Sequence, residues 1–171
     1  DAGPDNSLEV CQAMAAKEPR VKLFRHPGHV NKGAAESRNL GILNSTSELV
    51  AFLDADDFFL PTRFDAERRI FKEQPDADGV YGAIGPHYYD EAGRALFNRT
   101  FEHEITTVRK RVPPEQLFEG LSGGTGDFGH FSLDALTVKR AVLMGLGRLM
   151  RKEIHLHEDT DITTRLSWHA R

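Results

Sequence analysis

The sequence Leu-Val-Ala-Phe-Leu-Asp-Ala-Asp-Asp at residues 49–57 gives the strongest indication of the fold. Turn-forming residues precede five consecutive apolar residues, and the apolar run stops at Asp54. A short, uninterrupted run of this kind is typical of a strand buried on both faces, as in a parallel sheet between two helical layers. Its carboxylates follow the C-terminal end of the strand, which is where open α/β sheets bind ligands.

The segments before and after this strand alternate between helix and strand patterns up to about residue 75. Apolar residues at helical spacing predict one helix starting at Asn6 or Ser7 and a second over residues 34–43, with a short strand over 21–24 between them. Pro61 is a favourable first residue for the next helix. The alternation predicts an α/β fold in which helices flank a mostly parallel sheet.

The second half of the chain has a different pattern. Residues 78–97 are rich in β-formers and contain a plausible hairpin turn at 90–93, which predicts a β-rich insertion. Five glycines follow within 120–129, and a further strand is predicted over 133–138. Short helices are predicted over 113–119 and 139–144, and a last helix over 159–170.

The composition narrows the range of functions. The chain has 171 residues, of which 39% are hydrophobic and 28% charged, values typical of one soluble globular domain. A net charge of −4 and a pI near 6.1 argue against nucleic acid as a partner. The single cysteine, Cys11, excludes an internal disulfide, and no apolar run reaches the roughly 20 residues of a membrane helix. We expect a cytoplasmic protein, and peripheral association with a membrane stays open.

The carboxylates after the predicted strand suit a hard metal ion. On an extended chain Asp54 and Asp56 would point to the same side and Asp57 to the opposite side. Carboxylate oxygens favour Mg²⁺ or Mn²⁺, and diphosphate oxygens could complete the coordination shell. Two alternatives stay open: Asp56 or Asp57 could cap the following helix, and phosphatases with an aspartyl nucleophile also use Asp-x-Asp after a strand.

Two further polar segments could contribute to a site. Residues 158–161 (Glu-Asp-Thr-Asp) begin the last predicted helix, where the carboxylates could either cap the helix or supply a general base. Gly33 allows a tight entry into the second helix, whose N-terminus could face an anion. Arg38 and Asn39 lie one turn further on, in positions suited to a nucleotide base or phosphate or to a polar helix surface.

Taken together, these segments resemble the family 2 glycosyltransferases, which have the GT-A fold. The order and spacing agree over nearly the whole chain, and the agreement is loose over 70–151. The matching segments are 1–7, Asn31-Lys32-Gly33 with Arg38-Asn39-Leu40-Gly41, 50–57 with Pro61, and 158–161 with Arg165-Leu166.

The resemblance implies a division of roles within one domain. Residues 1–75 would form the nucleotide-binding part and 76–171 the acceptor side. The donor would be a UDP- or GDP-sugar, the acceptor a saccharide or another hydroxyl compound, and the cofactor Mn²⁺ or Mg²⁺. Asp159 would be the catalytic base of an inverting transfer and Asp56 the metal ligand. The implied substrate-binding residues are Asp1, Arg38, Asp54, Glu158 and His130.

The sequence also departs from the family pattern. The family's first strand and the helix after it have no counterpart here, so we expect a GT-A-like domain that is truncated at the N-terminus and incomplete at both ends. Such a sheet would have an open edge that another copy of the chain could cover. Two other functions stay open: a non-catalytic binding module or inactive fragment, and a metal-dependent phosphatase, which fits only the Asp-x-Asp segment.

Overall fold

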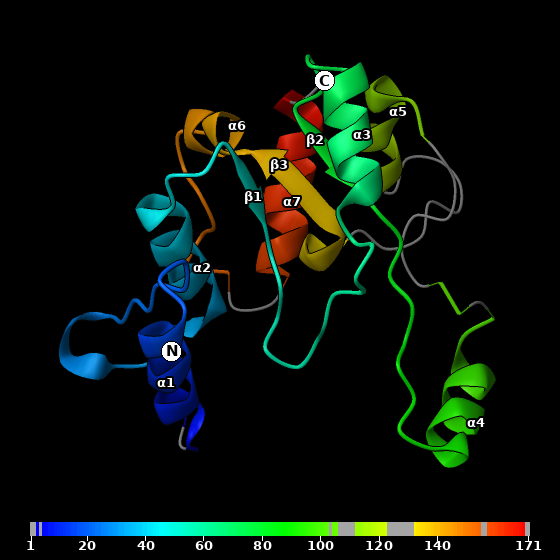
Figure 1. The fold of residues 1–171 in the computed structure, drawn as a ribbon. Helices are drawn as coiled ribbons and strands as arrows, with labels where there is room; N and C mark the ends of the chain where they lie inside the picture. The colour runs from blue at the N-terminus through cyan, green and yellow to red at the C-terminus, as the bar shows by residue number, and fades with distance from the viewer. Residues whose placement is uncertain are drawn as a thin grey trace.

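The computed structural model describes residues 3, 5–102, 104–105, 112–122, 132–154 and 157–169. Its helices and strands follow one another along the chain as labelled in Figure 1. The helices are α1 (Ser7–Lys17), α2 (Gly33–Asn44), α3 (Asp65–Glu73), α4 (Glu91–Thr100), α5 (Pro114–Leu121), α6 (Arg140–Gly145) and α7 (Glu158–His169). The strands are β1 (Leu49–Ala51), β2 (Gly79–Tyr81) and β3 (Leu136–Lys139), and short 3₁₀ turns occupy Pro27–His29 and Leu133–Ala135.

The three described strands form a sheet in the order β1-β3-β2. The α/β class is confirmed, but the expected parallel pairing is wrong for these strands, because both β1 and β2 run antiparallel to β3. The reason is where β3 begins: Ala51 near the end of β1 pairs with Thr137 near the start of β3. The chain therefore enters β3 at the carboxyl ends of its two neighbours and runs back between them.

Helices cover the sheet on both faces, as side-chain alternation along β3 shows. Leu136 and Val138 face a small cavity bounded by α5 and α7. On the opposite face, a Cβ added to Gly82 would lie 3.7 Å from Glu67 Oε1, which places α3 there. Because successive side chains in a strand point to opposite faces, the central strand β3 is buried from both sides.

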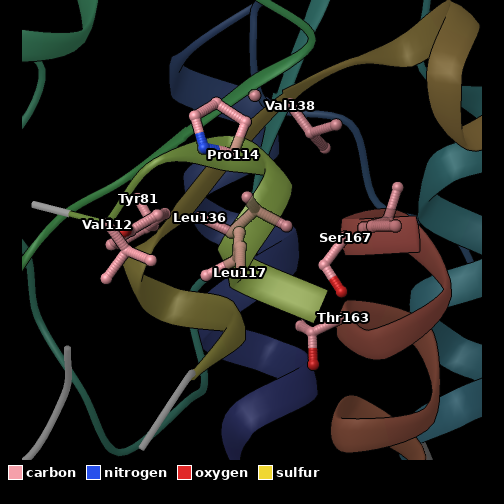
Figure 2. A pocket seen from close by; sticks show the side chains of 10 residues that line it. Tyr81, Val112, Pro114, Leu117, Leu136, Val138, Thr163 and Ser167 are labelled. Atoms are coloured by element: carbon pink, nitrogen blue, oxygen red, sulfur yellow. The ribbon is translucent and has the colours of Figure 1, made fainter. Parts of the chain in front are cut away.

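The hydrophobic core lies between the sheet, α7 and the elements around them. Its most completely buried side chains are Ile42, Val138, Leu143 and Ile162. The cavity between β3, α5 and α7 is lined mainly by apolar side chains, and Thr163 and Ser167 border it (Figure 2). Its volume of about 90 Å³ is too small for a nucleotide sugar, since ligand pockets usually enclose about 300–1,000 Å³. This cavity is a packing defect of the core and not the donor site.

The N-terminal half differs from the sequence prediction in three places. Residues 21–24 form no strand, because no described strand lies beside them to accept their hydrogen bonds. The strand at 49–53 is shorter than expected and is not buried on both faces, since Ala51 and Leu53 are exposed. Pro61 opens a turn, and the helix that follows it begins at Asp65.

The expected β-rich insertion over 78–97 is also wrong. Only Gly79–Tyr81 is a strand, and the chain then runs without regular structure into helix α4. The predicted hairpin turn is the first turn of this helix, because the Asp90 carboxylate accepts a hydrogen bond from the Gly93 N–H at 2.7 Å. An N-cap of this kind stabilises a helix start. In Figure 1, α4 lies apart from the sheet and its covering helices.

None of the helices in the described part of the chain combines the length and apolar character needed to cross a bilayer.

Candidate functional site

Three segments that are distant in the sequence meet at Arg38 on helix α2. Its guanidinium donates from Nη2 to Asp54 Oδ1 at 2.5 Å and from Nη1 to Glu158 Oε1 at 2.9 Å. These partners lie 16 and 120 residues from Arg38 in the sequence. The pKa of Arg38 is raised above its ordinary value: burial acts to lower it, and the hydrogen bonds and charges of the two carboxylates outweigh that effect. The structure therefore brings together Arg38, Asp54 and Glu158, which the sequence predicted as substrate-binding residues.

Residues 54–57 form a tight turn, called here the acidic turn. The Asp57 N–H donates to the Asp54 carbonyl at 3.2 Å, so the chain is not extended at this point. The prediction that Asp54 and Asp56 point to one side and Asp57 to the other is therefore wrong. The Asp56 side chain is exposed and makes no hydrogen bond or ion pair with the described residues. Its carboxylate is thus free to bind a cation from solution.

Asp134, which the sequence did not single out, supports the acidic turn from inside the protein. Asp134 is only 7% exposed, and its Oδ1 accepts the Asp54 N–H at 3.0 Å. Its carbonyl accepts a hydrogen bond at 3.1 Å from Arg63, which forms an ion pair with Glu67 on α3. The local pattern that could have drawn attention to Asp134 is Ser132, whose hydroxyl accepts the Asp134 N–H in a turn before β3. The contact with Asp54 spans 80 residues, so the sequence could not reveal it.

The surroundings of Asp134 raise its pKa from an ordinary value of 3.8 to about 6. Burial is the main cause, followed by a side-chain hydrogen bond with Asp57 and the negative charge of Asp54. The hydrogen bond from the Asp54 N–H acts in the opposite direction. Asp134 and Asp57 therefore face each other, and at least one proton is retained more strongly there than in the unfolded chain.

This pKa predicts a specific pH dependence of stability. Between pH 3.8 and about 6 the folded protein binds more protons at Asp134 than the unfolded chain does. The free energy of unfolding therefore falls as the pH rises through this window, and the cost is fully present above it. Asp134→Asn should remove the effect, so we expect its stability relative to wild type to improve by on the order of 1–3 kcal/mol from pH 4 to pH 7.5.

The measurement is urea unfolding of both proteins across that pH range. Asp65→Asn is the matched control, because Asp65 is an exposed carboxylate on α3 outside the acidic turn. Parallel stability curves for wild type and Asp134→Asn would contradict the assignment.

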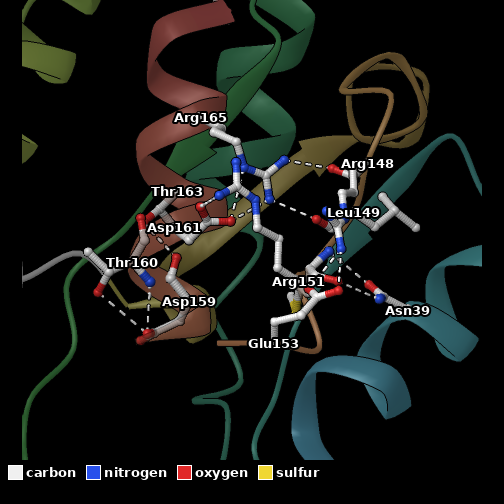
Figure 3. Close-up of polar contacts among 11 residues, drawn as sticks. Asn39, Arg148, Leu149, Arg151, Glu153, Asp159, Thr160, Asp161, Thr163 and Arg165 are labelled. Atoms are coloured by element: carbon white, nitrogen blue, oxygen red, sulfur yellow. Dashed lines mark hydrogen bonds and ion pairs between the residues drawn. The ribbon is translucent and has the colours of Figure 1, made fainter. Parts of the chain in front are cut away.

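Asp159, the predicted base, lies in the first turn of α7 beside Glu158. Its Oδ1 accepts the Thr160 N–H at 2.8 Å, and its carbonyl accepts the Thr163 hydroxyl (Figure 3). Because Glu158 is held by Arg38, the start of α7 is tied to the same ion-pair network as Asp54. The carboxylate of Asp159 is half-buried, and one of its oxygens makes a local contact that an asparagine could also make.

The neighbouring polar residues hold the structure together. Asp161 forms ion pairs with Arg165 at 2.7 Å and with Arg151 at 3.5 Å, and Arg165 also donates to the carbonyls of Arg148 and Leu149 (Figure 3). These contacts fix the segment before α7 against the helix.

Asn39 has a structural role of the same kind. Its side-chain amide donates to the Met150 carbonyl at 2.8 Å and accepts the Met150 N–H at 3.0 Å (Figure 3). Both ends of the amide are used in this pairing. Of the two roles left open for Asn39, these contacts support the structural one, in which it joins α2 to the segment before α7.

The protein groups that could hold a metal ion are few. Within the described ranges, no group of three or more His, Cys, Asp or Glu side chains is arranged to bind one. A cation at the acidic turn would therefore depend on Asp56 and on oxygens of the ligand it binds, a set of hard donors that suits Mg²⁺ or Mn²⁺. The predicted substrate-binding residues Asp1 and His130 lie outside the described residues.

Comparison with known proteins gives consistent similarities. The family model described as "Glycosyl transferase family 2" matches residues 1–136. An uncharacterized glycosyltransferase of Rickettsia conorii is 29% identical over 96 residues, which is 56% of this chain and 15% of that protein. The uncharacterized glycosyltransferase YibD of Escherichia coli is 40% identical over 65 residues, or 38% of this chain and 18% of that protein. Glycosyltransferase GlyG of Streptococcus pneumoniae is 34% identical over 94 residues, or 54% of this chain and 29% of that protein. The matches thus cover less than a third of the length of these relatives.

Proposed function

The chain belongs to the family 2 glycosyltransferases, and from this premise we propose that it transfers a sugar from a UDP- or GDP-sugar to an acceptor hydroxyl with inversion at the transferred carbon. Family membership carries with it the GT-A fold and the transferase class. The donor, the stereochemistry and the metal are the parts that we propose.

The observation that best supports the proposal is the ion-pair network around Arg38. It joins the acidic turn after β1 to the start of α7, because one guanidinium pairs with both Asp54 and Glu158. Asp56 and Asp159 each lie close in sequence to a member of this network. This arrangement supports our assignment of the residues for the donor and for proton removal to one site at the carboxyl end of β1.

On the donor side, we assign Asp54 and Arg38 to the ribose and base, and Asp56 would hold the divalent metal ion. Asp56 fits this role because it is exposed and has no partner among the described residues. The bound Mn²⁺ or Mg²⁺ would neutralise the charge that develops on the departing diphosphate. Asp134 positions the turn, because its carboxylate fixes the Asp54 N–H from inside the protein.

On the acceptor side, we assign Asp159 as the general base. Its carboxylate takes the proton of the acceptor hydroxyl as that oxygen forms a bond to the anomeric carbon of the donor sugar. The bond from this carbon to the diphosphate breaks on the opposite side, and the electron pair leaves with the nucleoside diphosphate. Attack opposite to the leaving group inverts the configuration.

The test is calorimetric titration of UDP and GDP into the chain, with and without Mn²⁺. We expect binding that requires the metal and that weakens at least about tenfold in Asp56→Ala, because the exposed carboxylate is the proposed metal ligand. Asp65→Ala is the matched control, since it removes another exposed carboxylate outside the acidic turn and should leave the affinity unchanged.

Absence of metal-dependent binding to a folded chain would contradict the proposed donor site. Metal-dependent binding without transfer from any donor sugar in a panel would instead favour a non-catalytic binding module. A cytoplasmic location, the lack of a nucleic-acid partner and self-association through an open sheet edge stay predictions from the sequence.

A further inference from the structure

Residues 82–102 and 104–105 form an excursion that the proposed donor site does not use. It leaves the sheet after β2, includes α4, and returns past Glu104, whose carbonyl lies 3.6 Å from where a Cβ on Gly85 would be. Figure 1 shows α4 at the far end of this excursion, away from the sheet. The excursion buries little of its apolar surface, because Tyr89, Leu96, Phe101 and Ile105 are all exposed.

A row of exposed aromatic rings connects the excursion to the acidic turn. Phe58 and His87 meet edge to face with their ring centroids 5.3 Å apart, and His87 meets Tyr89 in the same way at 5.3 Å. Phe58 is 59% exposed and Tyr89 is 93% exposed. We call these three residues the aromatic row. Phe58 directly follows Asp57, so the row begins where the acidic turn ends.

A groove lies beside the outer end of the aromatic row. It encloses about 580 Å³, within the usual range for pockets that bind small molecules. His87 and Tyr89 line it together with polar groups, of which the principal ones are Tyr88, Glu91, Arg94 and Glu104.

The polar groups of this groove are only partly used by the protein itself. Arg94 lies over the Tyr88 ring, with its central carbon 5.2 Å from the ring centre, and forms a long ion pair of 3.8 Å with Glu91. The Tyr88 hydroxyl is shielded from solvent and has no hydrogen-bond partner among the described residues. The groove thus combines exposed aromatic faces with donors and acceptors whose hydrogen-bonding capacity is not saturated.

We propose that the aromatic row and this groove bind the acceptor of the transfer reaction, and that the acceptor is a saccharide; this inference rests on the proposed function. A pyranose ring has one face of C–H bonds, which packs against the negative face of an aromatic ring, and a rim of hydroxyls. The groove offers both kinds of partner. Because the row starts at Phe58, next to Asp57, a sugar chain lying along it extends from the acidic turn toward α4.

The composition of the groove favours a saccharide over a purely apolar ligand. Three carboxylates and a guanidinium border it, and burying these charges against a hydrocarbon surface would be costly. The same groups can bond to hydroxyls, which are neutral and both donate and accept. A saccharide site on the excursion would also account for its exposed apolar side chains, which do not contribute to the core.

Saturation-transfer NMR on the whole chain tests the inference, with methyl β-glucoside, methyl β-galactoside and lactose as probes and glycerol as a polyol that lacks a ring. We expect transfer to ring C–H protons of at least one glycoside and none to glycerol. Tyr89→Ala should weaken that binding by about tenfold. Because Tyr89 is almost fully exposed, this variant should keep the wild-type melting temperature. Leu96→Ala is the matched control, since it removes an exposed apolar side chain on α4 that does not line the groove.

Absence of saturation transfer from a folded chain to every glycoside would overturn the inference, as would equal binding by Tyr89→Ala. Cosedimentation with phosphatidylglycerol vesicles in place of glycoside binding would overturn it too and would assign the excursion to a membrane surface. The two proposals fail separately. Loss of glycoside binding alone leaves the Mn²⁺-dependent titration of UDP and GDP intact, whereas loss of nucleotide binding alone leaves a saccharide site without a donor.

Discussion

Replacing Asp159 by asparagine is expected to lower the rate of sugar transfer by about 10²–10⁴-fold, the usual contribution of a general base. Asparagine is isosteric with aspartate and cannot take a proton from the acceptor hydroxyl. It can still accept the Thr160 N–H, which the Asp159 carboxylate accepts at 2.8 Å, so the start of α7 should stay intact. The effect should therefore appear in kcat, and the affinity for UDP or GDP should stay unchanged.

The measurement combines release of nucleoside diphosphate from a donor sugar with thermal unfolding. Asp161→Asn provides the contrast, because Asp161 lies two residues further on and is paired with Arg165 and Arg151. Weakening those ion pairs should lower the stability of the protein more than the rate per folded molecule. A full transfer rate in Asp159→Asn would exclude this residue as the base, and its contact with Thr160 in the first turn of α7 would be its role.

The second large effect is expected at Arg63, and it is an effect on stability. Arg63 is the ion-pair partner of Glu67, whose side chain is only 5% exposed, and it also donates to the Asp134 carbonyl. The ion pair uses Oε1 of Glu67, and the other oxygen, Oε2, has no hydrogen-bond partner among the described residues. Arg63→Leu would leave a buried carboxylate without its counter-ion, which typically costs about 3–5 kcal/mol.

Chemical denaturation of single and double variants measures this cost. Arg63→Leu together with Glu67→Leu should recover most of the lost stability, because the buried charge is then removed along with its partner. Arg68→Leu on α3, the helix that carries Glu67, is the matched control. Arg68 and Asp65 form a pair of 3.5 Å in which the side chains are 76% and 65% exposed, and such pairs contribute less than about 1 kcal/mol.

A double variant no more stable than Arg63→Leu would show that Glu67 is not the source of the cost. The Arg63 contact with Asp134 also links this helix to the acidic turn. In a folded sample of Arg63→Leu, we therefore expect weaker metal-dependent nucleotide binding than in Arg68→Leu.

Much of the local structure could be predicted from the sequence. The helix predicted over 34–43 is α2 at Gly33–Asn44, and the one predicted over 159–170 is α7 at Glu158–His169. The α/β class and the family are confirmed. These features depend on contacts between residues close in sequence: apolar spacing, caps, and a run of apolar residues that ends in carboxylates. The functional roles assigned to Asp54, Asp56 and Asp159 stay predictions.

The errors at the local level have a common cause. Residues 21–24 have the composition of a strand, but no strand in the described part of the chain lies beside them to pair with. Residues 90–93 have the composition of a hairpin turn but form the start of a helix. Strand formation requires a partner elsewhere in the chain, whereas a capped helix satisfies its own backbone hydrogen bonds. When a sequence pattern suits either a strand or a helix, the neighbouring segments in the folded chain therefore decide which of the two forms.

The sequence by itself determined which residues are candidates for the chemistry. Asp54 and Asp56 follow a run of apolar residues, and Asp159 lies at the start of a predicted helix. Only the tertiary structure decided how they are held. Arg38 pairs with Asp54 and, across 120 residues, with Glu158, and Asp134 reaches the acidic turn across 80. Neither contact leaves a periodic signal in the chain, since a hydrogen bond between distant segments depends on how the sheet and helices pack and not on the spacing of residues along the sequence.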